Sequence, residues 1–300
     1  MNRHQPQTNL NREALNHPRV GPVLNVMSVD LECWEQLVYR RLTGRTIQCS
    51  ENVIEATNRL LEIFEAKGIK ATFFVLGNIA EAFPELVKSI HGLGHEIATH
   101  GYSHTVLDRM APPQFREEIR KSVSLLESIT REKVIGFRAP EFSLSQSMSW
   151  AIESLAAEGI RYDSSILPTG NAYPPASERT IPKLSAGKSI IEIPPSTVSF
   201  LTHRILTGGS YFRLMPYPLM RRLLRTINNK GFPFVFYCHP YEFSPSALRV
   251  PDNGGSGMKV FKTECKYNLL LRRVPRKFTA LLTEFKFASF KEVLAHELSV

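Results

Sequence analysis

Short runs of apolar residues alternate with amphipathic stretches along most of the chain. The run Val23–Val29 ends at Asp30, as a buried parallel strand does, and the segment Val53–Lys67 has apolar residues at helical spacing. A second apolar run, 71–77, is again followed by a helical pattern over 79–93. This alternation predicts a parallel sheet whose strands are joined by helices.

The alternation continues to the end of the chain, and seven or eight strand–helix units predict closure of the sheet into a barrel. We expect the segment 200–217 to be irregular. We also expect residues 1–22 to be a flexible tail and residues 23–300 to be one α/β domain, in which 241–300 are a C-terminal extension packed on the barrel. The other predicted elements are a strand leading to His100, helix Pro113–Thr130, strand Val134–Arg138, helix Ser147–Glu158, strand Ser189–Pro194, helix Pro218–Asn229, strand Phe232–His239, helix Phe278–Phe285, strand Lys286–Phe290 and helix Lys291–Leu298.

Composition narrows the class of protein. The chain has 300 residues, of which 43% are hydrophobic, and it contains no apolar run of about 18 residues that would predict a spanning helix. Four scattered cysteines without a CxxC pair argue against a zinc ribbon or a disulfide framework and indicate reduced thiols. Because the first twenty residues are polar and lack a signal-peptide pattern, we expect a cytoplasmic protein.

The formal net charge of +9 is unevenly spread, with basic clusters at 259–277 and 221–225. Such clusters can attract phosphates, anionic lipid or nucleic acid, and a solvated basic face is the plain alternative. We expect no nucleic-acid partner, because no basic motif with interleaved aromatic residues is present. The amphipathic segment Met215–Ile227 and the basic clusters favour peripheral contact with an anionic membrane surface, at the inner membrane face.

Polar side chains follow the ends of the predicted strands. Asp30, His100, Arg138, Asp163 and His239 each stand at or just past the carboxyl end of a strand. Because these ends of parallel strands meet on one face of a barrel, we expect the five side chains to share a pocket.

Two imidazoles, His100 and His104, lie four residues apart around a Gly-Tyr-Ser turn. They can aim at one point and hold a divalent metal ion together with a carboxylate, although a surface turn with two unrelated histidines is an open alternative. In a strand, Asp30 and Glu32 would share one face and could reach the same water molecule.

These segments resemble the polysaccharide deacetylases with a NodB homology domain. The resemblance covers about residues 23–240 and implies a distorted (β/α)7 barrel of NodB type that removes N-acetyl groups from sugars with one divalent metal ion. It is carried, in order, by Asp30-Leu31-Glu32, His100-Gly101-Tyr102-Ser103-His104, Arg138-Ala139-Pro140-Glu141-Phe142, Asp163 and Cys238-His239-Pro240. The segments Gly208–Arg213, His239–Glu242 and Tyr267–Leu294 resemble the branch of the family found with exopolysaccharide biosynthesis.

The resemblance implies that His100 and His104 bind the metal ion, with Zn²⁺ the expected ion and Co²⁺, Mn²⁺ or Ni²⁺ as alternatives. In the common family pattern, two adjacent aspartates supply the general base and the third ligand. Here the second place is Leu31, so we assign Glu32 as the ligand and Asp30 as the base.

The resemblance also implies that Arg138 keeps Asp30 ionised, that His239 protonates the leaving nitrogen and that Asp163 hydrogen-bonds the other ring nitrogen of His239. A backbone N–H near Phe142 would donate to the oxyanion. Each assignment has a structural alternative: a surface arginine, an aspartate that caps a loop, or a core histidine.

Trp34 and Tyr211 are expected either to line a sugar platform, like Phe142, or to pack in the core. We therefore expect a metal-dependent N-deacetylase that hydrolyses the acetamide of an N-acetylated amino sugar in a surface polysaccharide or lipid-linked glycan pathway. The alternatives are a deformylase, a hydrolase of small cyclic amides, and a catalytically degenerate glycan-binding protein.

Overall fold

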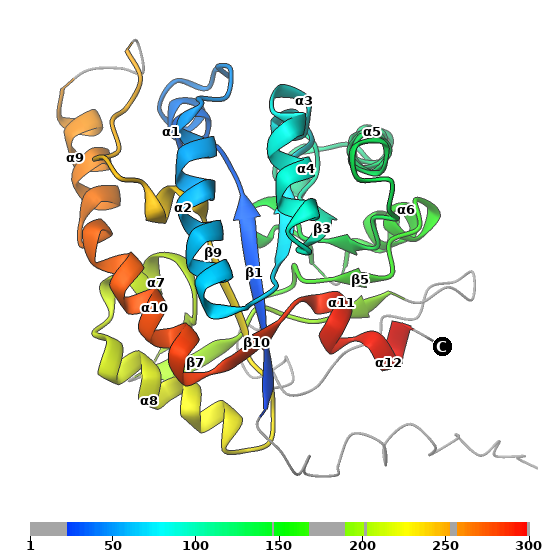
Figure 1. Cartoon of the computed structure of the whole chain (residues 1–300). Helices are drawn as coiled ribbons and strands as arrows, with labels where there is room; N and C mark the ends of the chain where they lie inside the picture. Colours follow the sequence, from blue (N-terminus) through cyan, green and yellow to red (C-terminus); the bar gives the residue numbers. More distant parts are fainter. Residues whose placement is uncertain (1–22, 146, 168–189, 201–202, 253–256, 299–300) are drawn as a thin grey trace, which may run out of the picture.

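A curled sheet of parallel strands forms the centre of the protein (Figure 1). The structure is a computed structural model that describes residues 23–145, 147–167, 190–200, 203–252 and 257–298, so the expected N-terminal tail lies outside the described residues. The expected NodB-type barrel class is confirmed. The strands of the sheet are β1 (Leu24–Leu31), β2 (Thr72–Val75), β3 (Glu96–Thr99), β4 (Gly136–Phe137), β5 (Tyr162–Asp163), β6 (Ile191–Glu192), β9 (Val235–Cys238) and β10 (Lys286–Ala288).

Strand β1 is the axis of the sheet. Every residue of its sequence LNVMSVDL except the first is buried, as expected for a strand covered on both faces. It pairs with β9 on one side, and on the other side first with β10 and then with β2. The C-terminal part of the chain thus contributes strands on both sides of β1.

The sheet is not closed by a continuous ladder between β6 and β9 in the described part of the chain. Ser196 bridges this seam: its amide donates to the carbonyl of Val235 (3.3 Å), and its hydroxyl accepts from the Val235 amide (2.8 Å). The hydroxyl of Thr207 donates to the same carbonyl (3.1 Å). Side chains therefore complete the backbone pairing where the barrel is distorted.

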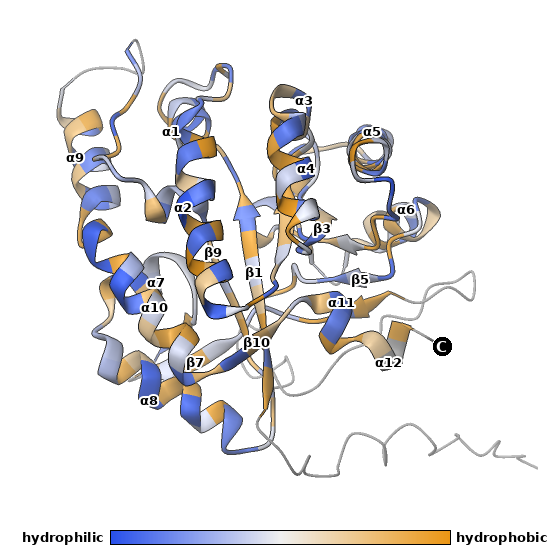
Figure 2. Cartoon of the chain, viewed as in Figure 1, coloured by the Kyte–Doolittle hydropathy of each residue, from blue (hydrophilic) through white to orange (hydrophobic). Residues whose placement is uncertain are grey.

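Helices cover the outside of the sheet, and along α2 and α5 hydrophobic and hydrophilic residues alternate (Figure 2). The predicted helix 79–93 is two helices, because the residue before Pro84 leaves the helical conformation. The helices in the first half of the chain are α1 (Trp34–Thr43), α2 (Asn52–Lys67), α3 (Gly77–Ala82), α4 (Pro84–Gly92), α5 (Pro112–Thr130) and α6 (Ser149–Ala157). Those in the second half are α7 (Gly209–Leu214), α8 (Tyr217–Asn228), α9 (Met258–Asn268), α10 (Val274–Glu284), α11 (Phe290–Val293) and α12 (Ala295–Leu298).

The segment 200–217 differs from the prediction of an irregular segment. An antiparallel hairpin joins β7 (Thr197–Phe200) to β8 (His203–Leu206), and α7 follows. A Cβ atom at Gly208 would lie 2.1 Å from the carbonyl oxygen of Tyr237, so only glycine lets this connection pass so close to β9.

Helices α1 and α9 were not predicted either. No helix in the described ranges combines the length and the apolarity needed to cross a membrane.

Candidate active site

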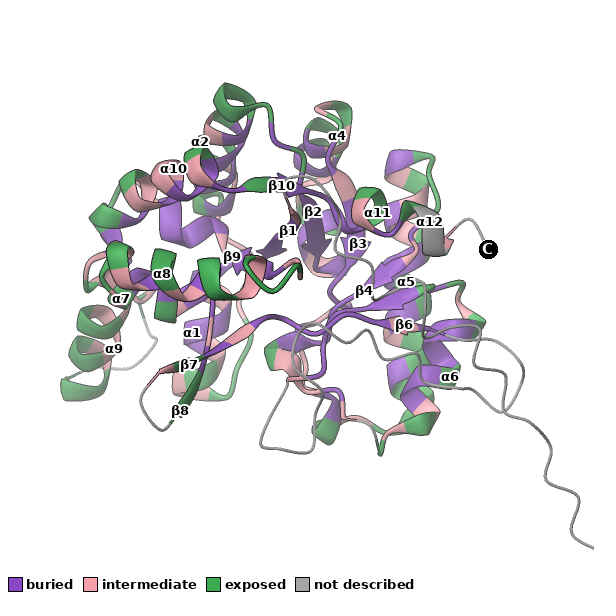
Figure 3. Ribbon diagram, turned by 90° about the horizontal axis from the view of Figure 1, so that it is seen from below, coloured by how far each residue is buried: buried purple, intermediate pink, exposed green. Residues whose placement is uncertain are grey.

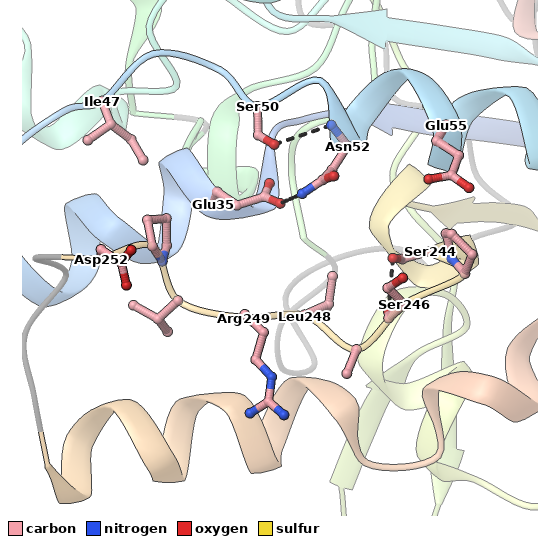
Figure 4. Close-up of a pocket in the computed structure, with 14 residues that line it drawn as sticks. Glu35, Ile47, Ser50, Asn52, Glu55, Ser244, Ser246, Leu248, Arg249 and Asp252 are labelled. Carbon is pink, nitrogen blue, oxygen red and sulfur yellow. Dashed lines mark hydrogen bonds between the residues drawn. The ribbon is translucent and has the colours of Figure 1, made fainter.

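The carboxyl ends of β1, β3, β4 and β9 surround one pocket of about 290 Å³. Asp30, Glu32, His100, His104 and His239 line it, so the structure brings together side chains that lie more than 200 positions apart. A second hollow, of about 530 Å³, lies between α1 and the segment 244–252 (Figure 4). Among the described residues, no histidine or cysteine lines that hollow. The side-chain amide of Asn52 donates to the carboxylate of Glu35 there (2.6 Å).

Glu32, His100 and His104 form a compact buried cluster in the first pocket. One carboxylate oxygen of Glu32 lies 3.2 Å from Nε2 of His100 and 3.1 Å from Nε2 of His104. Burial alone would raise the pKa of Glu32, but the imidazoles of His104, His239 and His100 together lower it well below its usual value. The carboxylate is therefore ionised.

The donor set of this cluster fits a zinc-like ion. Nδ1 of His100 donates to the carbonyl of Arg138 (2.7 Å), so a neutral His100 ring turns the lone pair of Nε2 toward the Glu32 carboxylate. A cation between these two acceptors removes their repulsion. Two donors on one zinc ion at 2.0–2.2 Å and tetrahedral angles lie roughly 3.3 Å apart, close to the contacts of Glu32. Two imidazoles and one carboxylate also leave a coordination position open toward the pocket.

His104 is held in a left-handed backbone conformation, with φ of 57°. Arg40 of α1 fixes this turn: its guanidinium donates to the carbonyl of Ser103 (2.9 Å) and to the carbonyl of His104. The same guanidinium lies 3.1 Å from Nδ1 of His104. Glu118 of α5 accepts from the Ser103 amide on the other side (3.0 Å). The second imidazole is thus placed by contacts from two helices rather than by its strand.

Asp30 and Arg138 form a buried ion pair beside the cluster. The guanidinium of Arg138 donates to Asp30 (2.7 Å), to the hydroxyl of Ser28 (2.9 Å) and to the hydroxyl of Ser164 (2.9 Å). The arginine side chain is fully buried, so the alternative of a surface arginine is wrong. The pairing holds the Asp30 carboxyl group at the edge of the pocket, beside a buried guanidinium.

His239 follows β9 and faces the same pocket from the other side. Its Nδ1 lies 3.4 Å from the carboxylate of Glu242, which also accepts from the His239 amide (3.1 Å). Burial lowers the pKa of His239, but the charges of Glu32, Glu242 and Asp30 outweigh it and raise the pKa to about 9. These carboxylates therefore favour the protonated form of His239.

Two parts of the chain match known sequence families. Residues 51–160 match the sequence family described as polysaccharide deacetylase, and residues 164–295 match a domain of unknown function, DUF3473. The chain contains a polysaccharide deacetylase domain. The first of these matches includes His100, His104 and Arg138.

Individual relatives of the deacetylase domain match over about a third of their own length. A peptidoglycan deacetylase-like protein of Gibberella zeae is 37% identical over 110 residues, which are 36% of this chain and 32% of that protein. A peptidoglycan-N-acetylglucosamine deacetylase of Bacillus cereus is 35% identical over 101 residues, 33% of this chain and 37% of that protein. A crystal structure of a Mycobacterium smegmatis protein assigned to the polysaccharide deacetylases has a TM-score of 0.60 at 19% identity, and covers 92% of this chain and 94% of that one. That likeness supports the fold alone.

Asp163 does not occupy the place expected for it in the candidate site. The structure puts Glu242, not Asp163, against Nδ1 of His239. Asp163 is paired in register with Glu192 of β6, so the two carboxyls lie side by side in the interior. Burial raises the pKa of Glu192 well above its usual value, and the charge of Asp163 adds to this. Burial raises the pKa of Asp163 as well, so the pair favours a shared proton over two buried charges.

The three residues expected to bind a substrate are placed differently. Trp34 and Phe142 line the pocket, and the indole N–H of Trp34 is buried without a hydrogen-bond acceptor among the described residues. The amide of Phe142 donates to the carbonyl of Ala139 (3.0 Å), so it is already engaged. Tyr211 does not line the pocket and is 45% exposed, whereas its neighbour Ser210 does line it.

A contact at the rim of the candidate pocket was not predicted from the sequence. Arg41 of α1 donates to Glu141 (2.8 Å) and to the hydroxyl of Tyr267 (2.6 Å), and so joins three separate elements at the pocket mouth. Tyr267 packs edge-on against Trp34, with ring centroids 5.6 Å apart. No sequence motif predicts the contact of Arg41 with Glu141 and Tyr267. Glu242, also missed, does carry one: a glutamate three positions after the residue that begins a helical turn.

Proposed function

We propose that this protein is a metal-dependent N-deacetylase that hydrolyses the acetamide of an N-acetylated amino sugar in a surface polysaccharide or a lipid-linked glycan. The observation that carries the proposal is the convergence of Glu32, His100 and His104 with two proton-transfer groups, Asp30 and His239, on one pocket. The names of the relatives support N-acetylated glycans as the substrate class. A cytoplasmic site of action and an exopolysaccharide pathway stay predictions.

A divalent ion held by Glu32, His100 and His104 would lower the pKa of a water molecule and polarise the acetamide carbonyl. Asp30, oriented by Arg138, takes the proton of the attacking water as the water oxygen bonds to the carbonyl carbon. His239 is protonated and donates its proton to the nitrogen as the C–N bond breaks. The products are the free amine and acetate, which releases the second proton of the water molecule to solvent. Asp30 and His239 return to their starting states when the proton held by Asp30 is passed to His239.

The deciding experiment measures bound metal and turnover in the same samples. Zinc-loaded protein is incubated with N-acetylglucosamine oligomers, peptidoglycan fragments and N-acetylated sugar nucleotides, and free amine and acetate are both assayed. We expect equimolar amine and acetate. Formate in place of acetate would identify a deformylase. If none of the substrates yields free amine, the proposal is contradicted.

Three variants separate the roles in that assay. We expect His104→Ala to lose stoichiometric metal, and Asp30→Asn to keep the metal but lose about 10²–10⁴-fold in turnover, as for a general base. His91→Ala is the matched control, since His91 lies on α4 and contacts Glu132 away from the pocket. Full turnover in Asp30→Asn would refute the assigned base.

A further inference from the structure

Helix α9 presents large apolar side chains to solvent. None of its residues is buried, and Met258 is 64% exposed, Phe261 62%, and Leu269, just past its end, 55%. With the exposed Cys265 they follow one another at intervals of three or four residues and form one stripe, here called the α9 stripe. Single exposed apolar residues are ordinary, but an ordered row on one helix is typical of an interaction surface.

Basic residues flank the α9 stripe. Lys259, Lys262 and Lys266 repeat the spacing of the stripe one position later, and all three are exposed. The exposed Arg272 and Arg273 continue the positive charge beyond the helix.

The acidic residue of α9 faces away from this surface. Glu264 is turned toward the segment 244–252, where it accepts from Arg249 (2.8 Å) and from the amide of Val250 (2.9 Å). The outward face of the helix therefore combines apolar and cationic groups and carries no acid.

Helix α9 is anchored firmly enough to hold this face outward. Asn268 exchanges hydrogen bonds with the amide (2.8 Å) and the carbonyl (2.9 Å) of Leu248, and Tyr267 packs on Trp34 and Tyr241. In two perpendicular views α9 lies at the edge of the molecule, and Figure 3 shows it in the exposed and intermediate colours along its length. The stripe is thus an outer surface and not an unpacked part of the core.

The segment Met215–Ile227, expected to be amphipathic and to contact a membrane, does not offer such a face. Met220 and Leu224 of α8 are fully buried, and Arg221 and Arg225 are turned to Glu284. The apolar face of α8 packs in the core, whereas the apolar face of α9 is exposed in the described structure.

We propose that the α9 stripe and its lysines dock on an anionic phospholipid surface. Apolar side chains that enter the acyl boundary beside lysines that meet lipid phosphates are the composition of an interfacial helix. A second copy of this chain is disfavoured as the occupant, because its own α9 face would bring positive charge against positive charge. Tyr267, on the inner side of α9, lines the pocket, and Lys266 reaches its rim from the exposed side. Docking would therefore place the pocket wall next to the lipid. That consequence rests on the proposed function, whereas docking itself does not.

The test is binding of the full chain to vesicles, measured without turnover. We expect the protein to sediment with vesicles of phosphatidylcholine and phosphatidylglycerol, but not with phosphatidylcholine alone, and the binding to weaken as salt is added. Met258→Ser with Phe261→Ser, and separately Lys259→Glu with Lys262→Glu, should each weaken vesicle affinity about tenfold or more. Turnover of a soluble substrate should stay unchanged in both.

Arg116→Glu with Arg120→Glu on α5 is the matched control, because it changes the charge by the same amount on another exposed helix face. We expect this control to bind vesicles much as the unaltered protein does. Equal loss in the control and the α9 variants would reduce the effect to net charge and overturn the proposal. The proposal would also be overturned if the protein did not bind vesicles and instead formed a dimer that Phe261→Ser dissociates. Vesicle binding is measured without catalysis, so a protein that binds vesicles but has no activity would contradict only the proposed function.

Discussion

One carboxylate, Glu242, sets the environment of the histidine that must donate a proton. It accepts from the His239 amide and lies against Nδ1, and its negative charge favours the imidazolium form. Asp163, which the resemblance assigned to this task, is occupied by Glu192 and Ser165 instead. The two carboxylates therefore predict different pH behaviour when each is neutralised.

We expect Glu242→Gln to move the alkaline limb of kcat/KM to lower pH by roughly one unit. A general acid must be protonated, so activity falls as pH rises through its pKa, and removal of a nearby negative charge lowers that pKa. The pH profile of Asp163→Asn, whose side chain does not contact His239, should keep its alkaline limb in place. An equal shift in both variants would restore Asp163 to the orienting role.

The sequence could locate the residues of the site that stand in short motifs, and could not assign their partners. The ends of predicted strands were enough to gather Asp30, His100, Arg138 and His239 on one face, because parallel strands align their carboxyl ends. Arg41, which joins α1 to Glu141 and Tyr267, depends on a helix more than 200 positions away. A contact of this kind is set by packing and leaves no local pattern.

At the scale of single elements, prediction succeeded where one face of a segment is buried. Helices α2 and α5 carry buried residues at helical spacing, and both were predicted. Helix α9 has no buried residue and was not predicted, although it carries apolar residues at helical spacing between its lysines. Helix α1 has no side-chain cap at its N-terminus, and its first turn follows the acidic residues of the site directly.

The junction of β2 and β3 contains a histidine that should make stability depend on pH. Nδ1 of His95 accepts from the amide of Ala71 (3.1 Å), and its ring packs on Phe64 and Phe73. Burial and the charge of Lys70 lower its pKa from about 6.5 to about 4. Protonation would break the hydrogen bond and charge the core.

Between these two pKa values the unfolded chain binds more protons than the folded chain, so the free energy of unfolding falls as pH falls. We expect a loss of about 2 kcal/mol from this histidine between pH 7 and pH 5, measured by urea unfolding. His95→Asn, which keeps an acceptor near the Nδ1 position but does not titrate, should be less stable at pH 7 and show a shallower pH dependence. An unchanged slope in that variant would place the sensitivity elsewhere.

At the scale of the molecule, the two matched sequence families cannot be two independent folding units. The segment 51–160 supplies β2, β3 and β4, whereas 164–295 supplies β6, β9 and β10. Strand β1 lies between them and pairs with β2 on one side and β9 on the other. The pocket is shared in the same way, with His100 and His104 from the first segment and His239, Lys266 and Tyr267 from the second.

The chain's two tryptophans offer a direct test of this unity, because they lie in different parts of the fold. Trp34 contacts Tyr267 of α9, and Trp150 of α6 packs on Phe115. Chains of this length often unfold through intermediates, but a shared sheet predicts that both ends lose structure together. We expect Trp150→Phe, which leaves Trp34 as the reporter, and Trp34→Phe, which leaves Trp150, each to give a fluorescence midpoint in urea that coincides with its own far-ultraviolet circular dichroism midpoint. If Trp34 reported an earlier midpoint than circular dichroism in the same variant, the C-terminal part would be a separable layer, and the pocket would lose its α9 wall before the sheet unfolds.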